Sequence, residues 1–296
     1  MKPDTQTKID KQTIHRLPVS SRIGTTVTSI FGNLILFLFT ITCTFPVVWL
    51  FYSALKTKNE FYANSVALPK SPNFNNFIMI LTESQMSTWI LNTIRNTVLS
   101  LICITMLGFI IGYFLSRFRF KGRYILYAFF LLGLVIPIHA IMIPMYVLFK
   151  NTGLLNQWYT LILPYVSFGL PVTIFLVDSY LQNIPREMEE AATIDGSSFT
   201  HTLFKIIFPM CLPVLVTAGI IQFFSSWNEF AFALILISKS SLMTVPVGLT
   251  LFKGAYATDY PSMMAAMFIA VLPAILIYFL FSKQIIKGMV TGAVKG

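Results

Sequence analysis

The chain has 296 residues, of which 56% are hydrophobic and only 11% are charged, and its formal net charge is +10. Soluble domains carry about 25% charged residues, so this composition excludes an ordinary soluble protein and indicates an integral membrane protein. The positive charge does not indicate a nucleic-acid binder, because the Lys and Arg residues form no motif of that kind.

The apolar residues occur in long runs, several of which reach the roughly 20 residues needed to cross the hydrocarbon core. We therefore predict an all-α, polytopic fold with six transmembrane helices at 30–54, 94–116, 124–149, 160–182, 210–237 and 263–282. The first span is too long for a cleavable signal peptide, so we expect it to remain as an anchor. Around the spans we expect an N-terminal tail at 1–29, an extracytoplasmic segment at 55–93, a membrane core at 94–282 and a C-terminal tail at 283–296.

Basic residues predict the orientation, because Lys and Arg concentrate in cytoplasmic loops. With six spans both termini lie on one side, and fourteen of the 21 Lys and Arg residues fall on that side. Both tails and the loop at 183–209 are therefore predicted to be cytoplasmic. Four prolines fall within predicted spans and are expected to kink them: Pro137, Pro144, Pro164 and Pro171.

The loop between the fourth and fifth spans is unusually acidic. Four carboxylates fall within nine positions: Glu187, Glu189, Glu190 and Asp195. A charge at the bilayer centre costs about 2.5–3.5 kcal/mol, so this stretch must lie at the membrane surface. Pro185 suits the first position of a short helix, Gly196 its end, and Ser197 or Ser198 the cap of a second helix. The same residues are equally consistent with an ordinary solvated loop.

The spacing in this loop resembles the EAA-x3-G-x9-I-x-L-P signature of membrane subunits of ATP-binding-cassette importers. The matching positions are Glu190, Ala191, Ala192, Gly196, Ile206 and Pro209, with Phe208 in place of Leu. The stretches WNEFAFALILI at 227–237 and TVPVGLTLFKGAYATDYPSMMAA at 244–266, with the terminal GAVKG, resemble the carbohydrate branch of this family, similar to the maltose-type G permease subunit.

The resemblance implies a type I importer permease fold in a bacterial inner membrane, with cytoplasmic coupling helices. The matching loop residues would dock a separate ATPase, which would bind ATP and Mg, while this chain would bind no cofactor. Further partners implied are a homologous second permease subunit, a second ATPase subunit, an extracytoplasmic solute-binding protein and a sugar, most simply an oligosaccharide. Nothing in the resemblance identifies the sugar, or which of the two permease subunits binds it.

A second group of polar residues lies in the fifth predicted span. Gln222, Ser226 and Glu229 are spaced i, i+4 and i+7, so on one continuous helix they share a face, with Trp227 and Asn228 beside it. This face could line a path for sugar hydroxyls, or its groups could satisfy each other or the neighbouring subunit. Asp178, in the fourth span, is expected to pair with an Arg or Lys.

No enzyme motif is present in the sequence. It has no G-x4-G-K-[ST] phosphate loop, no HExxH, and only three widely separated histidines, so we expect neither ATP hydrolysis nor a metal site in this chain. Two alternatives remain open: a secondary transporter driven by an ion gradient, and a membrane scaffold or receptor that transports nothing.

Overall fold

Over the residues it describes, 19–255 and 259–293, the computed structural model is built from helices alone. The longer helices are α1 (Val19–Ala54), α4 (Met86–Arg117), α5 (Arg123–Val135), α6 (Ile138–Asn151), α7 (Ile162–Leu181), α10 (Phe208–Trp227) and α13 (Tyr260–Ala293). Shorter elements connect them: α2 (Lys58–Ala63), α3 (Asn75–Thr82), α8 (Glu187–Ile194), α9 (Phe199–His201), the π-helix η1 (Thr202–Ile207), α11 (Ala231–Leu236), the 3-10 helix η2 (Ser240–Leu242) and α12 (Val245–Ala255). The chain divides into one unit that ends at Trp49 and a second that begins at Leu50.

Five helical stretches of the described chain are long and apolar enough to cross a membrane: Ile30–Ala54, Met86–Arg117, Ile162–Leu181, Phe199–Trp227 and Tyr260–Gln284. A sixth span results if α5 and α6 are counted together, so the all-α, six-span prediction is confirmed. Helix α1 begins at Val19, inside the predicted tail 1–29, of which 1–18 lie outside the described residues. Helix α13 likewise continues into the predicted tail 283–296, whose last three residues lie outside the described part.

The third predicted span is not one helix. Helices α5 and α6 meet at an angle of 104°. Ile136 ends α5 in an extended conformation, as expected for a residue that precedes proline, and α6 starts after Pro137. The predicted kink at Pro137 is therefore a complete break, and the prediction of a continuous helix over 124–149 was wrong.

Helix α4 starts eight residues before its predicted start at 94, because polar side chains in its first turns find partners on a distant segment. Trp89 Nε1 donates to the carbonyl of Ser240 over 2.9 Å, and Asn92 Nδ2 donates to the carbonyl of Met243 over 3.0 Å. The Thr93 hydroxyl accepts the N–H of Val245 over 2.9 Å. These hydrogen bonds pair polar side chains of Trp89, Asn92 and Thr93. All three residues fall in the segment 55–93, which we had predicted to precede the helix.

Helices α4 and α7 approach closely through two glycines of α4, one helical turn apart. A Cβ on Gly108 would lie 2.5 Å from a methyl carbon of Thr173, and one on Gly112 would lie 2.8 Å from a methyl carbon of Val177. Such small-residue contacts let membrane helices pack backbone to backbone. The α4–α7 pair is thus a tightly packed centre of the second unit.

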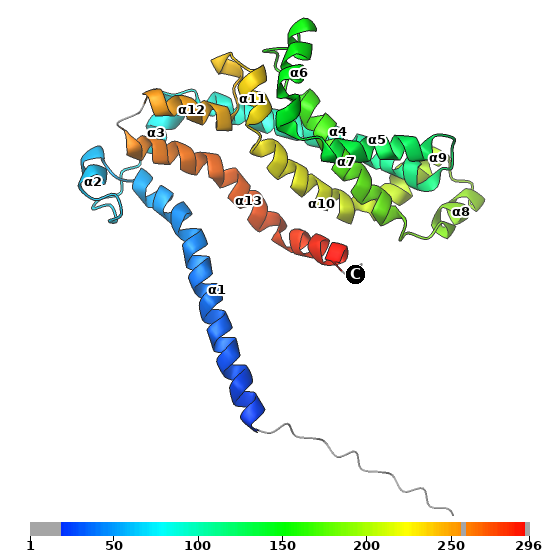
Figure 1. Ribbon diagram of the computed structural model, residues 1–296, viewed down its shortest axis with the longest axis horizontal. Helices are drawn as coiled ribbons and strands as arrows, with labels where there is room; N and C mark the ends of the chain where they lie inside the picture. Colours follow the sequence, from blue (N-terminus) through cyan, green and yellow to red (C-terminus); the bar gives the residue numbers. More distant parts are fainter. Residues whose placement is uncertain (1–18, 256–258, 294–296) are drawn as a thin grey trace, which may run out of the picture. The chain divides into compact units, whose positions relative to one another are not determined.

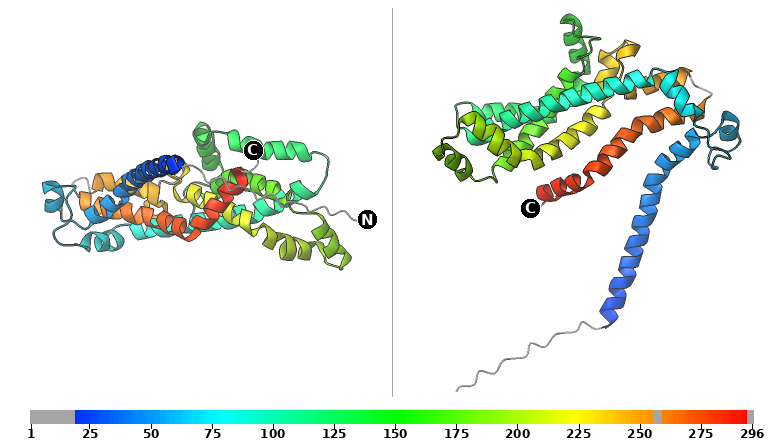
Figure 2. Two further views of the ribbon diagram at one scale, coloured as in Figure 1. Left: turned by 90° about the horizontal axis from the view of Figure 1, so that it is seen from below. Right: turned by 180° about the vertical axis from the view of Figure 1, so that it is seen from behind.

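Several of the short elements lie at opposite ends of this second unit. Helices α2, α3 and α12 lie at one end, and α8 and α9 lie at the other (Figure 1). The view from behind shows the same arrangement (Figure 2).

At the end that holds α2 and α3, the Lys56 side chain is buried. Lys56 is 1% exposed, donates to the carbonyl of Ser65 over 2.8 Å, and lies over the Tyr52 ring. Burial lowers the pKa of Lys56, and the nearby carboxylate of Glu60 opposes this shift.

We predict that Gly112→Ala destabilises the protein by about 1–3 kcal/mol, because the new methyl group overpacks the α4–α7 contact. Gly219→Ala is the matched control, since a Cβ at Gly219 meets no atom within 4 Å and both substitutions favour a helix equally. The measurement is thermal unfolding of the purified protein in detergent. Equal midpoints for the two variants would show that the helices do not depend on this contact.

Candidate functional site

The acidic stretch forms helix α8, which starts next to α4 and α7. Its N-cap is Arg186, whose carbonyl accepts the N–H of Glu189 over 2.9 Å and the N–H of Glu190 over 3.1 Å. Pro185 lies before the N-cap, and not at the first helical position as predicted. The three glutamates fall in the first turn, where the positive end of the helix dipole stabilises carboxylates.

Gly196 ends α8, as predicted. Its φ of +80° lies in the left-handed region. The N–H of Ser197 donates to the carbonyl of Ala192 over 2.9 Å, and the N–H of Gly196 to the carbonyl of Thr193 over 3.0 Å. This pair of bonds is a Schellman motif, for which glycine at the left-handed position is strongly favoured. Ser198 then caps α9 by accepting the N–H of His201, which confirms one of the two predicted caps.

Glu189 differs from its acidic neighbours because it points back at α4. Its Oε1 lies 2.6 Å from Arg117 Nε, and its Oε2 accepts the hydroxyl of Tyr113 over 2.7 Å. Arg117 also donates from an Nη to the carbonyl of Ile184 over 2.9 Å. We had not predicted this cluster. The available signal was the i, i+4 spacing of Tyr113 and Arg117, which places both on one face at the end of a span.

The residues that match the importer signature are divided between surface and interior. Glu190, Ala191, Gly196 and Pro209 are exposed, Ala192 is 7% exposed, and Ile206 is half-buried. Two further apolar side chains of α8, Met188 and Ile194, are exposed at 46% and 86%. The outward surface of α8 therefore combines a carboxylate, a small side chain and larger apolar groups.

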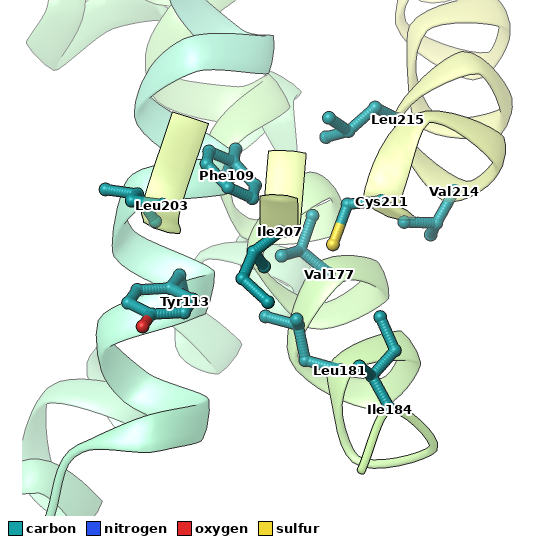
Figure 3. Close-up of a cluster of buried hydrophobic side chains, with 10 residues drawn as sticks. All are labelled: Phe109, Tyr113, Val177, Leu181, Ile184, Leu203, Ile207, Cys211, Val214 and Leu215. Carbon is teal, nitrogen blue, oxygen red and sulfur yellow. The ribbon is translucent and has the colours of Figure 1, made fainter. Parts of the chain in front are cut away.

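A cluster of buried apolar side chains anchors this end of the chain to the bundle (Figure 3). It joins α4, α7, the loop after α7, η1 and α10 through Phe109, Tyr113, Val177, Leu181, Ile184, Leu203, Ile207, Cys211, Val214 and Leu215. Half-buried Ile206 packs against the same cluster. The chain on both sides of α8 therefore packs into this core, while the outer surface of α8 is exposed.

The second candidate group does not form the predicted continuous face. Helix α10 ends at Trp227, and a new helix, α11, starts at Ala231, so Glu229 lies between two helices. Its Oε1 accepts the N–H of Phe232 over 2.7 Å, and its Oε2 accepts the N–H of Ala233 over 3.1 Å. Oε2 also accepts the hydroxyl of Tyr165 over 3.0 Å. Glu229 thus satisfies the free N–H groups at the start of α11.

The remaining residues of that group are mostly enclosed by the protein. Gln222, Ser226 and Trp227 are 4–5% exposed, and Trp227 Nε1 donates to the carbonyl of Ala270 over 3.2 Å. Asn228 is exposed and donates to the carbonyl of Phe224 in its own helix. That Gln222 and Ser226 border a path for solute stays a prediction.

We had expected Asp178 to pair with an Arg or Lys, but it forms no ion pair with any basic residue whose side chain the structure describes. It is 4% exposed, and its Oδ2 accepts Gln182 Nε2 over 3.1 Å. The ion pairs found in the described part of the chain are those of Lys58 with Asp259 and of Arg117 with Glu189. Within that part, no three His, Cys, Asp or Glu side chains are grouped as metal ligands would be.

The apolar spans define a polytopic membrane protein that carries a short acidic helix at one end. The family model of the binding-protein-dependent transport system inner membrane component matches residues 104–290. The chain belongs to this family, and it is therefore a multi-pass membrane protein that serves as a permease subunit.

Individual relatives agree with this assignment. The chain is 35% identical over 261 residues to the probable ABC transporter permease protein YurM of Bacillus subtilis, covering 88% of this chain and 87% of the relative. It is 32% identical over 263 residues to the trehalose/maltose transport system permease protein of Thermococcus litoralis, covering 88% and 94%. A chain of a bacterial ABC transporter involved in the import of the acidic polysaccharide alginate has the same fold, with a TM-score of 0.78 at 22% identity, covering 90% of this chain and 98% of that one.

We predict that Glu229→Ala destabilises the protein by about 1–3 kcal/mol, because it leaves buried N–H groups without an acceptor. Asn228→Ala is the control, since Asn228 is exposed and binds only its own helix. Thermal unfolding in detergent distinguishes the two variants. If Glu229→Ala unfolds at the same temperature as Asn228→Ala, Glu229 is not the cap that holds α11.

Proposed function

We propose that this chain is a permease subunit of an ATP-driven importer of sugars, most simply oligosaccharides, and that α8 receives a separate ATPase subunit. The sugar class is supported by the trehalose/maltose relative and by the WNEFAFALILI stretch. The family assignment does not favour the alternative of an ion-driven secondary transporter.

The proposed assembly pairs this chain with a homologous second permease subunit and two ATPase subunits. The ATPases bind ATP and Mg, and an extracytoplasmic binding protein delivers the sugar at the α2, α3 and α12 end. The α8 end and both termini then face the cytoplasm, as the distribution of basic residues suggests. This chain performs no covalent chemistry, and it binds no nucleic acid.

The observation that carries the proposal is that α8 presents an exposed outer surface while its inner side is buried and its end is a defined turn. Ala191 is small enough to permit close approach of a partner, Glu190 offers a charge, and Ile194 is an apolar group that solvation alone does not explain. Behind this surface Ala192 is buried and Gly196 ends the helix in a defined turn. An ordinary solvated loop needs neither the exposed apolar groups nor the anchoring core.

Energetic considerations support docking of the whole surface. Shifting a gate from 1:99 to 99:1 requires about 5.5 kcal/mol of differential binding. A single exposed ion pair supplies about 0–1 kcal/mol, so one contact at Glu190 is not enough. Carboxylate, alanines and apolar side chains of α8 must therefore act together as one interface.

The proposal is tested by reconstituting the chain with its candidate partners in proteoliposomes. We expect ATP hydrolysis to rise when binding proteins loaded with sugar are added, and to respond to only part of a saccharide panel. Sugar transport by the purified chain alone, driven by a proton or sodium gradient, would contradict the proposal.

We predict that Gly196→Val abolishes ATP-driven uptake, because a β-branched residue does not adopt the left-handed turn that orients α8. Gly196→Asn is the control, since asparagine tolerates that conformation and should retain most of the uptake. The amount of each variant in the membrane is measured alongside uptake. Uptake by Gly196→Val equal to that of Gly196→Asn would rule out a role for the turn.

We predict that Glu190→Lys weakens co-purification of the ATPase, because it reverses a charge on the docking surface. Glu83→Lys is the matched control, with the same charge change on an exposed residue that follows α3, a helix at the opposite end of the unit. The measurement is the ratio of ATPase to permease after affinity purification. An unchanged ratio for Glu190→Lys would mean that this carboxylate serves only solvation.

A further inference from the structure

The last turn of α4 contacts both the acidic helix and the loop before it through one side chain, Arg117. The Arg117 side chain is 7% exposed, forms the ion pair with Glu189 in α8, and donates to the carbonyl of Ile184 in the loop that follows α7. One guanidinium therefore bridges the end of α4, the end of α7 and the start of α8. An Arg side chain suits this junction because its planar group presents several fixed N–H donors.

Glu189 is the acidic residue of α8 that is engaged in this way. Glu187 and Glu190 are exposed, whereas Glu189 is partly buried and both of its oxygens face α4, one toward Arg117 and the other toward the Tyr113 hydroxyl. The outer face of α8 is thus available to a partner while the inner face is tied to α4. In this eight-residue helix the outer face can bind a partner, and the inner face attaches the helix to α4.

We propose that Arg117 and Glu189 are positioning residues that fix α8 to α4, so that a displacement of α8 moves α4 with it. This inference rests on the proposed docking of an ATPase at α8. The chain between α7 and α8 is short and not helical, and without an attachment to α4 it could act as a hinge. A hinge at that point would absorb the movement of the docked ATPase.

The packing of α4 explains how such a movement reaches the membrane core. Gly108 and Gly112 place the α4 backbone directly against Thr173 and Val177 of α7. Closely packed helices shift as rigid bodies, because an interior at this density does not deform continuously. The ion pair at the end of α4 therefore connects the docking surface to the most tightly packed helix pair of the chain.

The experiment uses the complete transporter in proteoliposomes and measures sugar imported per ATP hydrolysed. Glu189→Gln removes one charge of the pair with little change in size, and Arg117→Gln removes the other charge with a shorter side chain. Arg119→Gln and Glu187→Gln make the same replacements at exposed neighbours. We expect the first two variants to keep the ATPase bound but to lower the import per ATP about fivefold or more, the lower end of coupling between distant sites. Arg119→Gln should behave as the unmodified protein does. Glu187→Gln lies on the outward side of α8, so it should keep the import per ATP of the bound complex even where it lowers the amount of ATPase bound.

A charge-exchanged protein provides the test of rescue. Arg117→Glu combined with Glu189→Arg restores opposite charges at the same positions, and we expect it to recover import per ATP relative to either single reversal. Hydrogen exchange of α8 reports the attachment directly: Glu189→Gln should speed exchange of the α8 amides more than Glu187→Gln does.

The possible outcomes separate the two proposals. If Glu189→Gln matches Glu187→Gln in both import per ATP and α8 exchange, the positioning role is wrong while the docking proposal stands. If the unmodified protein fails to bind any ATPase, both proposals are overturned. Bound ATPase with uncoupled hydrolysis in Arg117→Gln and Glu189→Gln, and not in the controls, supports the positioning role.

Discussion

The close approach of α4 to α7 is the contact on which the rest of the second unit depends. Two glycines remove the side chains that would hold the helices apart, and the methyl carbons of Thr173 and Val177 occupy the space. Lipid tails are as apolar as the helices, so association in a membrane relies on such packing and not on the hydrophobic effect. The buried cluster of Figure 3 continues this interface to the end that carries α8.

Helix ends are the second constraint, because an unpaired backbone group in hydrocarbon costs several kcal/mol. The chain satisfies these unpaired backbone groups in a different way at each break between helices. Glu229 accepts the free N–H groups at the start of α11. At the membrane surface, where water can also pair with backbone groups, the Schellman turn at Gly196 satisfies the carbonyls at the end of α8. Between α5 and α6 the residue at the break is Pro137, which has no N–H to satisfy.

Much of the fold could be predicted because its causes are local. Runs of apolar residues indicated the spans, and Gly196 and Ser198 acted on neighbours within a few positions. The family signature around Glu190 added the functional class. Predictions failed where a distant residue decides the outcome. Glu229 ends the apparent fifth span by capping α11, and the Tyr165 hydroxyl that also binds it lies 64 residues earlier in the sequence, where no period reveals it.

For the same reason, only part of the candidate site could be predicted from the sequence. The exposed surface of α8 follows from sequence, since acidic residues in its first turn are followed by small ones. The inner attachment joins Arg117 to a carboxylate on another element, and the basic residue had been explained by membrane topology alone. Helix α4 was similarly predicted too short, because Asn92 and Thr93 resemble loop residues until their partners near Val245 are known.

The central claim is that α8 is a docking surface for a nucleotide-hydrolysing partner. Ile194, at 86% exposure and next to the end of α8, is the position from which to test it. A photo-reactive side chain introduced there, illuminated in the assembled transporter during ATP turnover, should form a covalent product with the ATPase subunit. A fully active assembly in which this side chain never cross-links to the ATPase, and reacts only with lipid or solvent, would contradict the claim.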